Sequence, residues 1–403
     1  MRFELTLALR YLKGNRHTLG GTLTSVISVA SVTVGVAALI ATLAVMTGFR
    51  EDIRKKILGT QPALIVLSQT GTMPEGDYSP VFSDVRDVRA WSPFILEQGL
   101  LKSGRRTQGA VVKGVDPDRE PAVTGLSSRV KTGRWEALRS STPTVLLGTE
   151  LASTLGVGEG DHLLLVVPSL SAGLFGDLPV MRRFVVGGTV ETGLYDYDSN
   201  LAVVSLASAQ RAFDRRQAWT GIGVKVRDPD DPFDAAFRIQ KNMGSSVYVR
   251  SWLAMNRNLF SALKLEKAVM FLILTLITLV AAFTILSNLI LVTAQKTREI
   301  GILKAMGATD GMIQRTFLLK GILLGLFGTG AGTALGLAIS WLLKAYPVVK
   351  LPADVYYVER LPVTVVPSDV MMVVGAALAI VLAATIYPAR IAAKLDALTA
   401  IRQ

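Results

Sequence analysis

The residue types that most often carry catalysis are scarce in this chain, and their spacing favours structural roles. The sequence has no cysteine and only two histidines, His17 and His162, so a metal centre or a nucleophile–histidine pair has few residues to draw on. Paired acidic residues occur in YDYD (195–198) and DPDDP (228–232), but aspartate beside proline is typical of turns. We therefore expect no catalytic residue and no metal site.

A glycine-rich phosphate-binding loop is also missing from the sequence. The segment GLFGTGAGTALG (325–336) is rich in glycine, but it lacks the lysine of a G-x-x-x-x-G-K-[ST] motif and lies in a long apolar run. The chain is therefore expected to bind no ATP by such a loop and to hold no cofactor of its own.

One short charged segment, KTREIGILKAMG (296–307), separates two long apolar runs. Ile300, Leu303 and Met306 or Gly307 recur at the spacing of one helical stripe. Gly307 can end this helix, because glycine readily adopts the left-handed conformation of a helix end. Two interpretations stay open: a basic loop folded onto lipid headgroups, or a helix that docks onto a separate ATPase. The charged residues take the other positions of the helix: Lys296, Arg298, Glu299 and Lys304.

The elements around this segment are membrane spans. Half of the residues are hydrophobic and the mean hydropathy is positive. A span needs roughly 20 helical residues, and the first long apolar run exceeds the length of a signal-peptide core, so we expect an uncleaved anchor. Four segments without any ionisable residue are long enough: 18–49, 268–294, 321–343 and 370–388.

Charge predicts the orientation of these spans. Basic residues exceed acidic ones by three in 1–17, by three in 295–320 and by two in 389–403, while 344–369 is neutral. By the positive-inside rule these three basic segments are cytoplasmic. Most of the net charge of +12 therefore flanks the spans, which argues against nucleic-acid binding. The uncharged spans also disfavour ion-coupled transport, so the energy for transport must enter from outside the membrane.

The insert between the first two spans predicts an external α+β domain, because short apolar runs alternate with turn signals. The fold class is an α-helical membrane protein with four transmembrane helices and a large α+β periplasmic domain inserted between helices 1 and 2. Expected strands are 62–68, 109–115, 142–148, 162–168, 182–190 and 201–206, and expected helices are 149–161 and 208–214. The expected order is an amphipathic elbow helix (1–17), span 1 (18–49), the periplasmic domain (50–267), span 2 (268–294), a cytoplasmic coupling region (295–320), span 3 (321–343), a short periplasmic loop (344–369), span 4 (370–388) and a cytoplasmic tail (389–403).

Two further features have more than one interpretation. The loop 169–183 is broken by glycine and proline yet carries apolar side chains, so it is either a buried hairpin tip or an exposed loop that holds a partner. The third span carries glycines at a spacing that lets another helix approach closely, within a bundle or a dimer. These are Gly321, Gly325, Gly328, Gly332 and Gly336.

Several stretches of the sequence together match one known pattern. They are LALRYLKG, ISVASVTVGVAALIATLAVMTGFREDIRKKILG, VVKGVDP, LLGTELASTLGVGEGD, ETGLYDYDSNLAVVSL, QKTREIGILKAMGAT and YPARIAAKLDALTAIR. In these stretches the chain resembles permeases of the lipoprotein-releasing (Lol-type) ABC transporters, within the larger group of macrolide exporters and cell-division permeases. One departure is that the family often has a proline where this chain has Ala397 or its neighbour.

The resemblance implies partners and residue roles. The chain would be a non-catalytic subunit in the inner membrane of a Gram-negative bacterium, paired with an ATPase dimer that uses ATP and Mg, and with an identical or paralogous permease. Lipoproteins would enter from the outer leaflet and pass to a periplasmic chaperone. The implied ATPase-coupling residues are Arg298, Glu299, Ile300, Leu303, Lys304, Met306 and Gly307. The implied chaperone-binding hook comprises Phe175, Gly176, Asp177, Leu178, Pro179, Arg182 and Arg183, and the implied acyl contacts are Leu39, Leu43 and Met46.

Two other functions remain open from the sequence. A permease of the same architecture can transmit force without a lipid substrate, in efflux or in the control of a cell-wall hydrolase. An enzyme acting in or beside the membrane would need catalytic residues, which the spans lack. The hook distinguishes lipoprotein release from force transmission, since only lipoprotein release requires a periplasmic chaperone.

Overall fold

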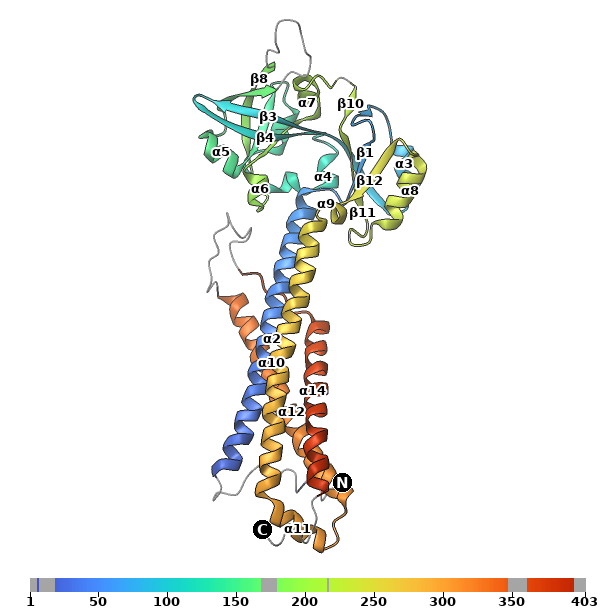
Figure 1. Cartoon of the computed structure of the whole chain (residues 1–403). Coiled ribbons are helices and arrows are strands. Elements are labelled where there is room, and N and C mark those ends of the chain that lie inside the picture. Colours follow the sequence, from blue (N-terminus) through green and yellow to red (C-terminus); the bar gives the residue numbers. More distant parts are fainter. Residues whose placement is uncertain (1–5, 7–18, 168–179, 216, 347–360, 395–403) are drawn as a thin grey trace, which may run out of the picture. The chain divides into compact units, whose positions relative to one another are not determined.

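The structure is a computed structural model that describes Thr6 and residues 19–167, 180–215, 217–346 and 361–394 (Figure 1). The chain divides into two compact units, which are described separately. The helical unit comprises the described residues up to Glu51 and from Ala262 onward. The sheet unit comprises Asp52–Ser261.

The helical unit contains four helices that are long and apolar enough to cross a membrane, which confirms the number of apolar helices expected from the sequence. Each extends beyond the uncharged segment that predicted it. They are α2 (Leu19–Thr60), α10 (Arg257–Gln295), α12 (Asp310–Ala345) and α14 (Pro367–Ala393), and a short fifth helix, α11 (Thr297–Ala305), lies between α10 and α12 in the chain.

Glycines on α12 let two other helices approach closely. A Cβ built on Gly321 would lie 2.2 Å from the side chain of Thr385 on α14, which is far inside van der Waals contact. Further along, a Cβ on Gly328 would lie 2.8 Å from Cβ of Val32 on α2. The two other glycines of the stripe nearest α2, Gly332 and Gly336, face that helix in the same way. The stripe therefore packs within one chain, first against α14 and then against α2.

Polar side chains also join the long helices. Inside the bundle, Asn288 of α10 donates a hydrogen bond from Nδ2 to Oγ of Ser28 on α2, at 3.1 Å, and both residues are buried. Near one end of the unit, Lys267 of α10 lies 3.3 Å from both carboxylate oxygens of Asp369 in the first turn of α14. Thr47 of α2 donates to the same carboxylate at 3.1 Å. Asp369 therefore links three helices.

The sheet unit is built on one mixed sheet. Its strand order is β12-β1-β11-β3-β4-β9-β6-β8-β5, and β7 pairs with both β3 and β8. Most neighbours are antiparallel, but β4 with β9 and β6 with β8 are parallel. The strands are β1 (Leu64–Ser68), β3 (Val88–Ser103), β4 (Arg106–Val115), β5 (Val130–Gly133), β6 (Thr144–Gly148), β7 (His162–Val167), β8 (Val180–Val190), β9 (Leu201–Ser205), β11 (Gly221–Val226) and β12 (Val247–Ser251), and β2 (Met73–Pro74) pairs separately with β10 (Ala218–Trp219).

Two apolar cores hold this sheet, one on each face of its central strands. On β6, Val145 and Leu147 belong to one core and Leu146 to the other, as the alternation of side chains along a strand requires. The apolar runs of β6 and β9 are uninterrupted because both faces of these two strands are covered. The covering helices and turns are α3 (Ser79–Ser83), α4 (Glu120–Val123), α5 (Thr149–Leu155), α6 (Tyr195–Asp198), α7 (Leu206–Ala212), α8 (Phe233–Met243), α9 (Trp252–Met255), η1 (Leu126–Arg129) and η2 (Trp135–Arg139).

Candidate functional site

The short charged helix α11 has well-defined ends. Its first backbone bond runs from the amide of Ile300 to the carbonyl of Lys296, at 2.9 Å. At the other end, Gly307 has a φ of +100°, and its amide donates to the carbonyl of Lys304. The amide of Ala308 donates to the carbonyl of Leu303, which completes a Schellman motif. Gly307 thus ends α11 as the sequence predicts.

The apolar side of α11 packs inside its own chain. Ile300 is fully buried in the core of the helical unit, together with Ile313 and Phe317 of α12 and Ala389 of α14, and Leu303 packs against this core. These two residues therefore hold α11 in place. Met306 does not continue their stripe, because it follows the last helical residue, Ala305, and it is 80% exposed.

Lys304 is also engaged within the chain. Its ammonium lies 2.6 Å from the carbonyl oxygen of Ala393, the last residue of α14. It lies 2.7 Å from Oδ1 of Asp310, the first residue of α12. The side chain is only 12% exposed. The sequence predicts that Lys304 contacts a separate protein. In the structure this residue instead joins three helices of its own chain.

The exposed side of α11 contains residues that the sequence-based stripe omitted. Arg298 and Glu299 are exposed, Lys296 donates a hydrogen bond to Glu299, and Ile302 is 45% exposed. With Met306, these residues form what we term the outer face of α11: Arg298, Glu299, Ile302 and Met306. The spacing from Arg298 to Ile302 is one helical turn, so the sequence contained the signal for this face.

A buried cation lies further along α12. Lys320 is fully buried, and its ammonium has no hydrogen-bond partner among the residues that the structure describes. The sequence placed Lys320 at the end of a charged cytoplasmic segment, whereas it lies well inside a 36-residue apolar helix. An unpaired polar group in a protein interior usually reduces stability or serves a function.

The expected chaperone hook is only partly described. Phe175, Gly176, Asp177, Leu178 and Pro179 lie outside the described residues. Arg182 and Arg183 lie in β8, where they pair with Leu165 and Leu164 of β7, and both side chains are exposed.

Both arginines line a groove of about 910 Å³ in the sheet unit. Arg211 of α7 lines it as well, and two acidic residues, Glu75 and Asp214, are also among its walls. We call this feature the arginine groove and define it by Arg182, Arg183 and Arg211.

The expected acyl contacts on α2 are mostly buried within the chain. Leu39 and Leu43 are 5% and 2% exposed and belong to the core of the helical unit, and Met46 is half-buried. Exposed apolar side chains of α2 lie elsewhere, for example at Val26 and Val34. Among the described residues no group of three or more His, Cys, Asp or Glu side chains is placed to hold a metal ion.

Comparison with known proteins first defines the class. Residues 25–242 match the family model of the MacB-like periplasmic core domain, and residues 271–397 match that of the FtsX-like permease C-terminal. The first match begins within α2 and ends inside the sheet unit, and the second begins within α10 and covers α11, α12 and α14. The chain is therefore a membrane permease of the MacB/FtsX superfamily.

Full-length relatives then specify the family. The lipoprotein-releasing system transmembrane protein LolC of Xylella fastidiosa (strain Temecula1 / ATCC 700964) is 33% identical over 409 residues, covering 99% of this chain and 98% of the relative. LolC of Neisseria meningitidis serogroup B (strain ATCC BAA-335 / MC58) is 30% identical, with 99% of each chain covered. LolE of Haemophilus influenzae (strain ATCC 51907 / DSM 11121 / KW20 / Rd) is 28% identical, with 98% of each covered. The chain belongs to this family of lipoprotein-releasing system transmembrane proteins.

Proposed function

We propose that this chain is the permease subunit of an ATP-driven transporter that extracts lipoproteins from the outer leaflet of the inner membrane and passes them to a periplasmic chaperone. The observation that carries the proposal is the full-length similarity, at 30–33% identity, to proteins named for lipoprotein release. The structure supports it with four apolar helices and a separate folded unit of mixed sheet.

The proposed topology places the sheet unit in the periplasm, inserted between spans 1 and 2. In the chain its strands all lie between α2 and α10, and the matching family model is described as a periplasmic core domain. The basic segments at both termini and around α11 then lie in the cytoplasm, in agreement with the positive-inside rule.

The proposed site for the ATPase is the outer face of α11. The chain has no phosphate-binding loop, so ATP and Mg would be bound by a separate ATPase dimer. An exposed apolar pair, Ile302 and Met306, flanked by charged residues fits a protein groove better than a headgroup layer alone. Ile300, Leu303 and Lys304 would then transmit motion from that face to α12 and α14. Ile300 and Leu303 belong to or pack against a core that includes residues of both helices, and Lys304 contacts both directly. A second permease, identical or paralogous, would complete the transporter.

The proposed chaperone site is the segment 175–179 together with the arginine groove. Three arginines concentrated in a groove of this size would attract an acidic surface of a soluble protein. For the acyl chains of the lipoprotein, the exposed apolar faces of α2 and α10 are the proposed contacts. Leu272 and Leu276 of α10 are 66% and 58% exposed, whereas the originally expected Leu39 and Leu43 would require the bundle to open.

The proposed function is tested by purifying the tagged chain from its native membranes in mild detergent and identifying its companions by mass spectrometry. We expect an ATPase, and peptides that begin with an acylated cysteine. A tagged four-span protein of unrelated sequence serves as the control for adhering lipoproteins. The preparation is then placed in lipid nanodiscs and supplied with ATP or a non-hydrolysable analogue. Release of lipoprotein with ATP but not with the analogue supports the proposal. If the purified chain instead carries an ATPase with a wall hydrolase or an efflux adaptor and no lipoprotein, force transmission replaces lipoprotein release as the function.

A further inference from the structure

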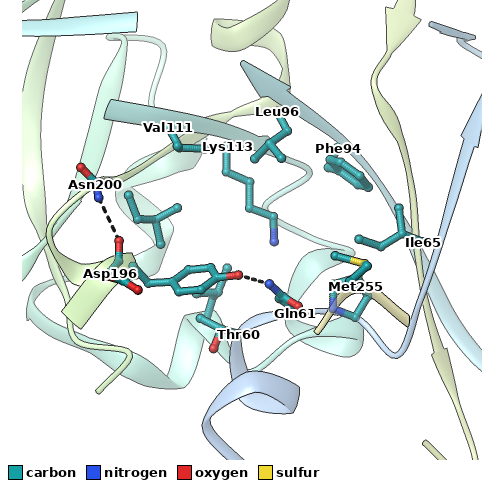
Figure 2. Close-up of a pocket in the computed structure, with 14 residues that line it drawn as sticks. Thr60, Gln61, Ile65, Phe94, Leu96, Val111, Lys113, Asp196, Asn200 and Met255 are labelled. Carbon is teal, nitrogen blue, oxygen red and sulfur yellow. Dashed lines mark hydrogen bonds between the residues drawn. The ribbon is translucent and has the colours of Figure 1, made fainter. Parts of the chain in front are cut away.

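The sheet unit contains a pocket of about 280 Å³ that the proposed function has not used (Figure 2). Its walls come from the end of α2, from β1, β3, β4 and β9, and from α6, α9 and η1. The apolar side chains that line it are Pro62, Ile65, Phe94, Leu96, Val111, Leu126, Leu201 and Met255, and the polar ones are Thr60, Gln61, Lys113, Asp196, Tyr197 and Asn200.

The cation that lines the pocket, Lys113, is neutralised by the protein itself. Figure 2 shows the Lys113 side chain reaching into the hollow between Leu96 and Gln61. Its ammonium is paired with the buried carboxylate of Glu120 at 2.6 Å, and that carboxylate also accepts a hydrogen bond from Thr124. An anionic ligand would have to compete with Glu120 for this cation, so the pocket favours an uncharged ligand.

The polar side of the pocket is a short hydrogen-bonded chain. Gln61 donates through Nε2 to the hydroxyl of Tyr197, and Asn256 donates through Nδ2 to Oε1 of Gln61 at 3.4 Å. Burial, with a smaller contribution from Asp196, raises the pKa of Tyr197, so its hydroxyl is neutral at physiological pH. These groups satisfy one another and leave the apolar wall as the surface available to a ligand.

Two of the pocket's residues lie near the ends of the chain segment that forms the sheet unit. Thr60 is the last residue of α2, and Met255 lies two positions before α10 begins at Arg257. The apolar wall also reaches the surface, since Leu96 is 45% exposed and Met255 is 40% exposed. The pocket therefore offers an exposed apolar rim to a ligand.

We propose that this pocket holds part of one acyl chain of a lipoprotein during its transfer from the membrane to the soluble carrier. The inference rests on the proposed function, and it assigns to that function a subsite outside the membrane. The physical reason is the cost of exposing lipid to water. For each methylene group of an acyl chain, the equilibrium constant for transfer from an apolar site to water falls about fourfold. A narrow, largely apolar pocket whose lysine is already paired suits an alkyl chain, whereas a folded peptide needs more room and more hydrogen-bond partners.

The test uses the full-length chain, with its accompanying proteins, in lipid nanodiscs. The probe is a synthetic lipopeptide with a triacylated N-terminal cysteine and a photoreactive diazirine near the end of one acyl chain. After ATP is added and the sample is illuminated, adducts are mapped by mass spectrometry. We expect adducts on the segments that contain Leu96, Leu126 and Leu201, and we expect excess unlabelled lipopeptide to remove them.

A matched pair of variants provides the control. Leu96 and Leu100 lie on the same strand, β3, and each is 45% exposed, but only Leu96 lines the pocket. We expect Leu96→Glu to reduce labelling of the pocket at least tenfold, and Leu100→Glu to leave it within twofold of the unmodified chain. Leu96→Met should retain labelling, which separates the loss of apolar character from a general loss of folding.

The outcomes distinguish this inference from the function on which it rests. Release of the lipopeptide without pocket adducts, or equal labelling in Leu96→Glu, would overturn the acyl subsite and leave the proposed function intact. Competition by phospholipid as strong as that by lipopeptide would overturn the assignment to lipoproteins. If the unmodified chain releases no lipopeptide with ATP, the proposed function itself fails.

Discussion

The ammonium of Lys304 lies 2.6 Å from the backbone carbonyl oxygen of Ala393, a residue 89 positions further along the chain. The same ammonium pairs with Asp310 at 2.7 Å, so one cation joins α11 to the end of α14 and the start of α12. Carbonyl groups at a helix C-terminus lack partners within the helix and favour a positive charge. A force applied to α11 therefore has a direct polar route into two long helices.

Replacing Lys304 by methionine tests this route. The substitution keeps the apolar stem and removes both polar contacts, so we expect the free energy of unfolding to fall by about 1–3 kcal/mol, as for a buried hydrogen bond to a charged group. ATP-driven release should fall further than ATP hydrolysis, because the contact that transmits motion is lost. Thermal unfolding in nanodiscs and a release assay measure the two effects.

The control for this substitution is Lys296→Met, at the residue that directly precedes α11. Lys296 makes an ion pair with Glu299 three positions away, within the same helix end, and such pairs contribute only about 0.3–0.5 kcal/mol. We expect a small effect on unfolding and no separation of release from hydrolysis. If Lys296→Met behaves like Lys304→Met, the loss reflects the charge of the region and not the link between helices.

The two sides of α11 should respond differently to substitution. Ile302→Glu combined with Met306→Glu places charge on the outer face, where both side chains are exposed. We expect the ATPase to be lost from the purified complex while the chain unfolds at an unchanged temperature. Ile300→Ala, in the core, should instead reduce the free energy of unfolding by about 2–5 kcal/mol. An unfolding defect in the double variant, or retention of the ATPase, would contradict the assignment of the faces.

The difference between these faces also shows where sequence reasoning was sufficient. The position and ends of α11 follow from local signals, since charged residues interrupt the apolar runs and Gly307 supplies the left-handed end. The role of each face depends on contacts distant in sequence: Ile300 meets α12 and α14, and Lys304 meets Ala393. Helical periodicity identifies an apolar stripe but does not say whether it faces the chain itself or a partner.

In the sheet unit, too, local sequence signals predicted some elements and missed others. The predicted strands correspond to β1, β4, β6, β7, β8 and β9, and all of these except β9 begin or end near a glycine or proline. The longest strand, β3, was missed because Pro93 and charged residues interrupt its apolar pattern. Pro93 is tolerated there although it has no amide hydrogen to donate to a neighbouring strand. The pocket could not be predicted, because its walls come from positions between Thr60 and Met255 that only the fold brings together.

Replacing the buried cation of α12 should raise the free energy of unfolding, whereas the substitutions of Lys304 and Ile300 should lower it. Lys320→Met retains most of the side-chain volume and removes an ammonium that is fully buried without a hydrogen-bond partner among the described residues. If Lys320 has no function, the free energy of unfolding should rise by about 1–3 kcal/mol, the usual cost of an unsatisfied buried polar group. Chemical denaturation of the chain in nanodiscs measures this change. A loss of stability, or a loss of ATP-driven release, would mean that the charge is used in another state of the transporter.

The arginine groove predicts a salt-dependent interaction. Arg182→Glu combined with Arg183→Glu reverses two charges on exposed side chains of β8. We expect affinity for the periplasmic chaperone to fall at least tenfold at low salt, with a smaller difference at high salt, because exposed charges are screened. Arg238→Glu on α8, also exposed, is the control and should bind as before. An equal loss of chaperone affinity in the double variant and in Arg238→Glu would indicate a response to net charge alone.

The glycine stripe of α12 offers a test of packing inside the membrane. In Gly321→Ala the added methyl would lie 2.2 Å from Cγ2 and 2.8 Å from Cβ of Thr385, so α12 and α14 must separate. We expect the free energy of unfolding to fall by about 1–3 kcal/mol, as for other overpacked interiors. Gly330→Ala is the matched control on the same helix, because nothing lies within 4 Å of its added methyl. It should leave unfolding unchanged or slightly improve it, since alanine favours the helix. Similar losses in both variants would mean that the contact with Thr385 does not determine the effect, and that the stripe is not needed for close packing.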